Sequence, residues 1–259
     1  PPLDLMWLIM ESQASPSHVG ALLLFEKQKG NPEEVRQIVE AYRSFQPTPP
    51  FNYVVETGVT GLPHFRETTS YDPCYHIQHI ALPDGATYDD LLRLVADLHE
   101  PMLDRCRPLF RDWIIDGVPG NRFAVYAKVH HAIIDGVSGT KRLYASLSPS
   151  PKRVIPMPAF AALVSVHKPR ARRDVSVGAL KKGLASLFGA DPVGSAPFTA
   201  QRAPMNEPLQ MARSIATLSL PLDEMHAVGG HFGATLNDLA VTIVDEGVHR
   251  YLRQTGLPF

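Results

Sequence analysis

Apolar and polar positions in the first half of the chain recur at both strand and helix periods. The run His18–Glu26 is almost continuously apolar, which predicts a buried strand, and a Gly-Asn-Pro break separates it from a helical pattern over Glu33–Phe45. Tyr75–Leu82 alternates apolar and polar residues and indicates another strand. Leucine and valine then recur at helical spacing over Thr87–His99, where Thr87 is placed to cap the helix. The pattern is that of a mixed α/β protein.

Two apolar, β-rich runs, Leu109–Ile115 and Arg122–Val129, flank a turn-rich loop and predict an antiparallel hairpin. If Ile115 pairs near Arg122, antiparallel counting places Arg107 and Pro108 opposite His130. A helical pattern follows over Val137–Leu147.

Regular patterning is lost after Leu147. Residues 148–211 are rich in proline, glycine and serine and are interpreted as a crossover linker with one helix over Val175–Phe188. The basic run Lys168–Arg173 within it is interpreted as a solvated face, with contact to an anionic membrane surface as the alternative.

Periodicity returns in the last part of the chain. Ala212–Pro221 predicts a strand ending in proline, and Leu222–Phe232 and Thr235–Leu252 predict two helices. Thr235 and Asp238 have the spacing of a capping box, which would account for Asp238. Asn237 has no role in capping and is predicted to project into a cleft or to support a neighbouring loop.

Composition narrows the function classes. The 259 residues are 44% hydrophobic and 20% charged with a formal net charge of −1, which fits a globular protein and lacks the basic stripe of a nucleic-acid binder. The two cysteines, Cys74 and Cys106, are too few for a disulfide framework or a zinc ribbon. No apolar run is long enough to span a bilayer, and the beginning of the chain lacks the pattern of a signal peptide, so a cytoplasmic location is expected.

The strongest candidate for chemistry is His130-His131-Ala132-Ile133-Ile134-Asp135-Gly136, at the end of the predicted strand. Strand side chains alternate faces, so only one of the two histidines should face a given cleft. Neutral imidazole is well matched to removing a proton from an alcohol near neutral pH. Asp135 is expected to organise the turn, and Gly136 to tolerate a positive φ there. The residues alone leave open a structural role for the histidines and a metal site built from imidazole and carboxylate.

Four features together resemble the bacterial wax ester synthase/acyl-CoA:diacylglycerol acyltransferase family. They are Leu3-Asp4 with Glu11 and Pro16–Gly20, the Pro108-Leu109-Phe110 string, the HHxxxDG heptapeptide, and Leu236-Asn237-Asp238. HHxxxDG alone is shared with chloramphenicol acetyltransferase, plant alcohol acyltransferases and peptide-synthetase condensation domains, and the other three features favour the narrower family.

The resemblance implies an α/β fold of the chloramphenicol acetyltransferase type, in which two related halves enclose a tunnel. Residues 1–147 would form the complete N-terminal domain, 148–211 the crossover linker, and 212–259 the start of a truncated C-terminal domain. The implied reaction is transfer of a fatty acyl group from acyl-CoA, as co-substrate, to a long-chain alcohol or diacylglycerol. No metal or other cofactor is implied, and no GxSxG elbow is present to indicate an acyl-enzyme.

By the same resemblance, His131 is the general base, His130 supports it, and Asp135 holds the loop. Gly136 leaves room near the base. Mainly structural or site-shaping roles fall to the remaining motif residues, Pro108, Leu109, Phe110, Asn237 and Asp238.

The shorter length of this chain leads to further expectations. A second polypeptide could complete the C-terminal half, and a peripheral contact with the inner face of the cell membrane or with lipid inclusions is expected. Two alternatives to the enzyme remain: a non-catalytic lipid-binding or assembly half of a split acyltransferase, and a condensation-type domain that takes carrier-bound substrates. A metal hydrolase is a further alternative.

Overall fold

The computed structural model describes residues 2–29, 31–59, 61–148, 150, 157–162 and 212–257. The chain divides into two compact units, one formed by residues 1–166 with 209–215 and the other by 167–208 with 216–259. The predicted linker helix over Val175–Phe188 and the basic run Lys168–Arg173 lie outside the described residues. The division into domains at 147 and 211 therefore stays a prediction.

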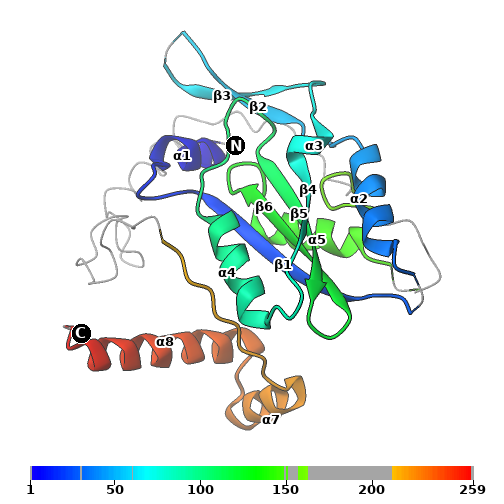
Figure 1. The fold of residues 1–259 in the computed structure, drawn as a ribbon. Helices are drawn as coiled ribbons and strands as arrows, with labels where there is room; N and C mark the ends of the chain where they lie inside the picture. Colours follow the sequence, from blue (N-terminus) through cyan, green and yellow to red (C-terminus); the bar gives the residue numbers. More distant parts are fainter. Residues whose placement is uncertain are drawn as a thin grey trace. The chain divides into compact units, whose positions relative to one another are not determined.

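The first unit is built on a four-stranded sheet with the order β1-β6-β5-β4 (Figure 1). β1 pairs antiparallel with β6, β6 antiparallel with β5, and β5 parallel with β4. A separate two-stranded sheet joins β2 to β3. The strands are β1 (His18–Glu26), β2 (Tyr53–Thr57), β3 (Pro63–Glu67), β4 (Ile77–Ala81), β5 (Phe110–Val118) and β6 (Arg122–His130).

Helices cover both faces of the four-stranded sheet (Figure 1). Val35 and Val39 of α2 pack with Phe110 and Ile114 on one face, whereas α4 packs its leucine and valine side chains with Trp113 on the other. Alternate strand side chains thus enter different cores, as the period of two requires. The helices of this unit are α1 (Pro2–Met10), α2 (Glu34–Ser44), α3 (Pro73–His76), α4 (Tyr88–His99) and α5 (Gly136–Ser146).

The described part of the second unit contains α7 (Leu222–Phe232) and α8 (Leu236–Thr255). α7 ends at Gly233, whose φ of 63° closes the helix in the left-handed region. Thr235 caps α8, and the reciprocal hydrogen bonds between Thr235 and Asp238 confirm the predicted capping box. None of the helices in the described residues is both long enough and apolar enough to cross a membrane.

Most of the predicted elements are confirmed. The strand His18–Glu26 is present, but the expectation that it is buried is wrong, because β1 lies at the edge of the sheet and only His18 is buried. The strand expected over Tyr75–Leu82 begins only at Ile77. The Asp72 carboxylate accepts hydrogen bonds from the amides of Cys74 and Tyr75, and Pro73 occupies the first helical turn. This cap stabilises the short helix α3 instead of extended backbone.

The predicted strand over Ala212–Pro221 is wrong. Residues 212–220 have no regular secondary structure, and none of the described strands pairs with them in a hydrogen-bonded ladder. Ile215 instead packs against the core that contains Trp113.

The register predicted for the β5–β6 hairpin is also wrong. A bulge lies between Ile115 and Val118, where Gly117 has a φ of 76°, so β5 continues to Val118 and pairs there with Arg122. Ile115 consequently pairs with Ala124, and the residue opposite His130 is Leu109, whose carbonyl oxygen accepts from the His130 amide at 3.0 Å. The α1 helix and the β2–β3 hairpin were not predicted.

Candidate active site

The two histidines of the heptapeptide lie where β6 ends and the chain turns into α5. The His130 amide bonds toward β5, and the His131 amide donates to the Ser17 carbonyl oxygen at 2.8 Å, just before β1. The backbone of both residues is thus fixed by neighbours on opposite sides of β6. Their side chains also point to different surroundings, as strand alternation predicts.

His130 is completely buried. Its Nδ1 accepts a hydrogen bond from the Ala132 amide at 3.0 Å, so Nε2 carries the proton of the neutral ring. Nε2 lies 3.1 Å from Glu11 Oε2 in a bent contact. The first histidine of the motif is therefore locked into the interior and does not line the cavity beside His131.

Glu11 forms the centre of a buried polar network. Its Oε2 accepts from Arg105 Nη2 at 2.9 Å and Nε at 3.2 Å, while Oε1 accepts from the Ser17 amide at 3.0 Å. Arg105 also donates to the Leu8 carbonyl oxygen at 2.7 Å. Burial alone would raise the pKa of Glu11, but the close contact with His130 and the hydrogen bonds from Ser17 and Arg105 outweigh it and lower the pKa to about 2. The network joins the end of α1 to the end of β6.

His131 is partly buried and lines a cavity of about 320 Å³. Its ring lies against the Trp7 ring of α1, with centroids 4.4 Å apart and planes inclined by 30°. Its Nδ1 is buried and has no hydrogen-bond partner among the residues that the structure describes. Packing against Trp7, rather than a carboxylate, restricts the orientation of this imidazole.

Asp135 is the N-cap of α5, and its Oδ1 accepts from the Ser138 amide at 2.7 Å. This hydrogen bond is the main reason that the pKa of Asp135 lies below its ordinary value. The residue organises the turn, as expected, without a direct contact to His131. The expectation of a positive φ at Gly136 is wrong, because Gly136 begins α5 in ordinary helical backbone. A Cβ there would meet nothing within 4 Å, and the residue lines the cavity.

The cavity beside His131 lies between the sheet and α5 and is mainly apolar. Val19 and Ala21 of β1 line it together with Ala127 and Val129 of β6, and Leu143 lines it from α5. Such a cavity suits an alkyl chain whose reacting end lies at His131.

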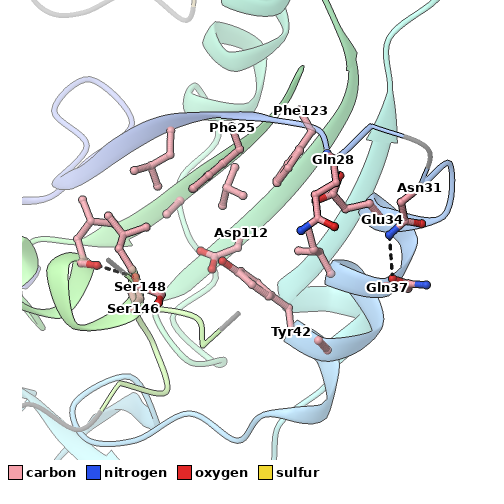
Figure 2. Close-up of a pocket in the computed structure, with 18 residues that line it drawn as sticks. Phe25, Gln28, Asn31, Glu34, Gln37, Tyr42, Asp112, Phe123, Ser146 and Ser148 are labelled. Atoms are coloured by element: carbon pink, nitrogen blue, oxygen red, sulfur yellow. Dashed lines mark hydrogen bonds between the residues drawn. The ribbon is translucent and has the colours of Figure 1, made fainter. Parts of the chain in front are cut away.

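A second cavity, of about 340 Å³, follows the same face of the sheet and contains neither motif histidine. Figure 2 shows its wall, with Phe25 and Phe123 on one side and Tyr42 of α2 on the other. The two cavities share four lining residues, Asp112, Ala127, Leu143 and Ala159. They are therefore neighbours along one sheet face.

The string Pro108-Leu109-Phe110 is buried at the start of β5. Phe110 lines the cavity beside His131 and stacks with Phe160, at a centroid distance of 4.9 Å. These residues fill the core next to the histidines, in agreement with a structural role. Asn237 and Asp238 lie at the start of α8 in the second unit, where Asp238 completes the capping box of Thr235 and Asn237 is exposed. A site-shaping role for these two residues stays a prediction.

Three contributors to this region were missed in the sequence: Trp7, Arg105 and Asp112. Glu11 was noted only as part of the resemblance. An aspartate inside the apolar run Leu109–Ile115 was a signal that could have been used, since strands buried on both faces rarely hold an unpaired carboxyl. The described residues include no group of three or more histidine, cysteine, aspartate or glutamate side chains arranged to hold a metal ion.

Comparison with known proteins identifies the relatives of this chain. Residues 1–240 match the model of the wax ester synthase/diacylglycerol acyltransferase catalytic domain. The probable diacylglycerol O-acyltransferase Tgs4 of Mycobacterium tuberculosis is 32% identical over 98% of this chain, and the O-acyltransferase WSD of Acinetobacter baylyi is 30% identical over 97%. The chain spans 60% and 58% of those two relatives.

A solved structure gives the same result for the fold. The wax ester synthase/diacylglycerol acyltransferase from Marinobacter aquaeolei VT8 superimposes with a TM-score of 0.77 at 27% identity, covering 100% of this chain and 62% of that one. The predicted α/β acyltransferase fold is thereby confirmed. Because the model match covers most of the chain, this protein belongs to the wax ester synthase/diacylglycerol acyltransferase family.

Proposed function

We propose that the intact protein transfers a fatty acyl group from acyl-CoA to the hydroxyl of a long-chain alcohol or of diacylglycerol. The observation that carries this proposal is the position of His131 on the wall of a mainly apolar cavity of about 320 Å³. A lipid chain needs an apolar channel, and its hydroxyl needs a base where the channel ends. Family membership and the names of the relatives support the choice of substrates.

In the proposed mechanism, His131 takes the proton of the acceptor hydroxyl while the hydroxyl oxygen attacks the thioester carbonyl carbon. The new C–O bond forms as the carbonyl π pair moves onto its oxygen. When the tetrahedral intermediate collapses, the C–S bond breaks, and the departing CoA sulfur receives the proton from His131. The base ends the cycle neutral, and the products are an ester and CoA.

The other motif residues have supporting roles in this proposal. His130 fixes the end of β6 through Glu11, and Asp135 fixes the start of α5. Gly136 keeps the cavity wall open, since no side chain extends from it. Phe110 shapes the cavity from the start of β5, and Pro108 and Leu109, just before it, hold it in place. Asn237 and Asp238 keep their predicted site-shaping role. Acyl-CoA is a co-substrate, and the reaction requires no further cofactor.

The proposal includes two kinds of partner. The chain spans 60% of the relative Tgs4, and a second polypeptide is proposed as one partner. The protein would work in the cytoplasm against a membrane or lipid-inclusion surface, from which its substrates come. Met6, Trp7, Ile9 and Met10 of α1 are exposed apolar side chains that suit such a contact.

The test is an acceptor panel with the intact protein. Palmitoyl-CoA is supplied with hexadecanol, dipalmitoylglycerol or no acceptor, and both CoA and ester are measured. We expect CoA release and ester formation in equal amounts, only when an acceptor is present. CoA release without ester would contradict acyl transfer. Bound acyl chains without turnover would favour a lipid-binding half, and activity only with carrier-bound acyl groups would favour a condensation-type domain.

A further inference from the structure

Asp112 is a buried carboxyl on the cavity side of β5. It lies between Phe110 and Ile114 on the same sheet face, opposite Ala127 of β6, and only 6% of the residue is exposed. No hydrogen bond or ion pair joins its side chain to any residue in the described part of the chain. A carboxyl in apolar surroundings is stabilised by a hydrogen-bonding partner. The Asp112 carboxyl has none among the described residues and is therefore able to bind a polar group of a ligand.

The cationic groups that border the first cavity are already engaged elsewhere. Arg142 donates to the carbonyl oxygens of Pro49 and Ala162, and its guanidinium also lies over the Phe51 ring. Lys128 directs its Nζ to the carbonyl oxygens of Leu98, His99 and Pro101. Neither side chain neutralises Asp112. Burial accordingly raises the pKa of Asp112 to about 7.

Asp112 belongs to the wall of both cavities on this sheet face. The first cavity contains His131, and the second extends past Tyr42 toward Gln28 and Asn31 (Figure 2). Of the four residues that the cavities share, Asp112 is the only one with a polar side chain, the others being Ala127, Leu143 and Ala159. A chain that starts at His131 and continues into the second cavity must pass this carboxyl.

We propose that the two cavities hold one lipid chain and that Asp112 binds a hydroxyl group carried partway along it. A hydroxyl suits this position because it can both donate and accept, and so pairs with the carboxyl in either protonation state. A cation would have to be desolvated among apolar walls, and a carbonyl oxygen could only accept. The preferred substrates would thus be hydroxylated acyl or alcohol chains. This inference rests on the proposed function for the class of ligand and adds a determinant of specificity.

The test is a binding series with the intact protein. Octadecanoic acid and its monohydroxy positional isomers displace a fluorescent fatty acid, and the affinity is measured for each isomer. We expect the isomers whose hydroxyl lies at the carbon position that reaches Asp112 to bind about tenfold more tightly than octadecanoic acid. One additional buried hydrogen bond would give an effect of this size. Asp112→Leu should remove this preference while octadecanoic acid binds within about threefold of wild type, because the wall becomes apolar.

Matched variants complete the test. Asp112→Asn retains a donor and an acceptor and should keep most of the preference, and Asp116→Asn, farther along β5 and paired with Lys27, should keep all of it. If Asp112→Leu does not fold, Asp112→Ala removes the same carboxyl without added bulk. Equal binding of every isomer by the wild type would overturn the proposal, as would a preference that survives both Asp112→Leu and Asp112→Ala.

The transfer reaction is assayed separately with octadecanoyl-CoA and the hydroxyoctadecanoyl-CoA esters. Normal transfer without any preference for hydroxylated chains in binding would contradict the role of Asp112 and leave the proposed function intact. If hydroxylated chains bind more tightly but no ester is a substrate for transfer, the hydroxyl-binding role of Asp112 is supported and the proposed function is contradicted.

Discussion

The indole ring of Trp7 covers the imidazole of His131, with ring centroids 4.4 Å apart. This contact brings α1 into the site, although Trp7 and His131 are far apart in the sequence. Because His131 Nδ1 has no hydrogen-bond partner in the described part of the chain, the indole is the main restraint on the ring. The proposed base is thus oriented by packing.

Removal of the indole should slow acyl transfer. We expect Trp7→Ala to lower kcat by roughly tenfold, because a base that rotates freely spends less time in the reactive geometry. Trp7→Phe should retain most of the activity, and Tyr144→Ala, which removes an exposed aromatic side chain from α5, should have little effect. Unchanged kcat in Trp7→Ala would show that the contact does not orient the base.

Loss of the Glu11 charge should destabilise the first unit. Glu11→Gln leaves His130 and Arg105 without their carboxylate, and we expect a loss of roughly 2–3 kcal/mol, moderated because Arg105 is partly exposed to solvent. Urea denaturation measures the change. Gln37→Glu, on the exposed side of α2, serves as a charge-change control. A loss no larger than that of the control would contradict the role of the network.

The pH dependence of stability tests the same carboxylate. Its pKa falls from the ordinary 4.5 to about 2 on folding, so the stabilisation is fully present above pH 4.5 and is lost as the pH falls toward 2. The free energy of unfolding should therefore decrease more steeply between pH 4.5 and 2 in the wild type than in Glu11→Gln. Parallel curves would show that Glu11 is not held ionised by this network.

The effect of Asp112 on stability should depend on pH in the opposite direction. Burial raises its pKa from 3.8 to about 7, so the folded protein retains a proton that the unfolded chain has lost, and stability falls as the pH rises through this window. The rise corresponds to a penalty on the order of 4 kcal/mol, fully present above pH 7. Asp112→Asn should flatten the curve between pH 4 and 7 and raise stability at pH 8. A curve that keeps its wild-type slope would exclude a buried, protonated Asp112.

Local patterns were sufficient to predict the scaffold. Periodicity and neighbours within a few residues were enough to predict three features. These are the strand His18–Glu26, the helix that follows Thr87, and the capping box of Thr235 and Asp238. The exact pairing of β5 with β6 could not be predicted, because the bulge at Gly117 changes the register without changing the apolar pattern.

The polar part of the site depends on contacts between distant residues. Glu11 and Arg105 are separated by 94 positions and meet only when α1 packs beside the end of β6. No spacing rule joins them in the sequence. The HHxxxDG motif identified where the chemistry would lie, whereas the partner of His130 and the packing of His131 required the fold.

The central claim is that His131 removes the proton of the acceptor. The most direct measurement compares ester formation from palmitoyl-CoA and hexadecanol by the intact wild type, by His131→Ala, and by His79→Gln, an exposed histidine on β4, after circular dichroism shows that all three are folded. We predict that His131→Ala lowers kcat by about 10²- to 10⁴-fold and that His79→Gln does not. Ester formation by a folded His131→Ala variant at close to the wild-type rate would contradict the account.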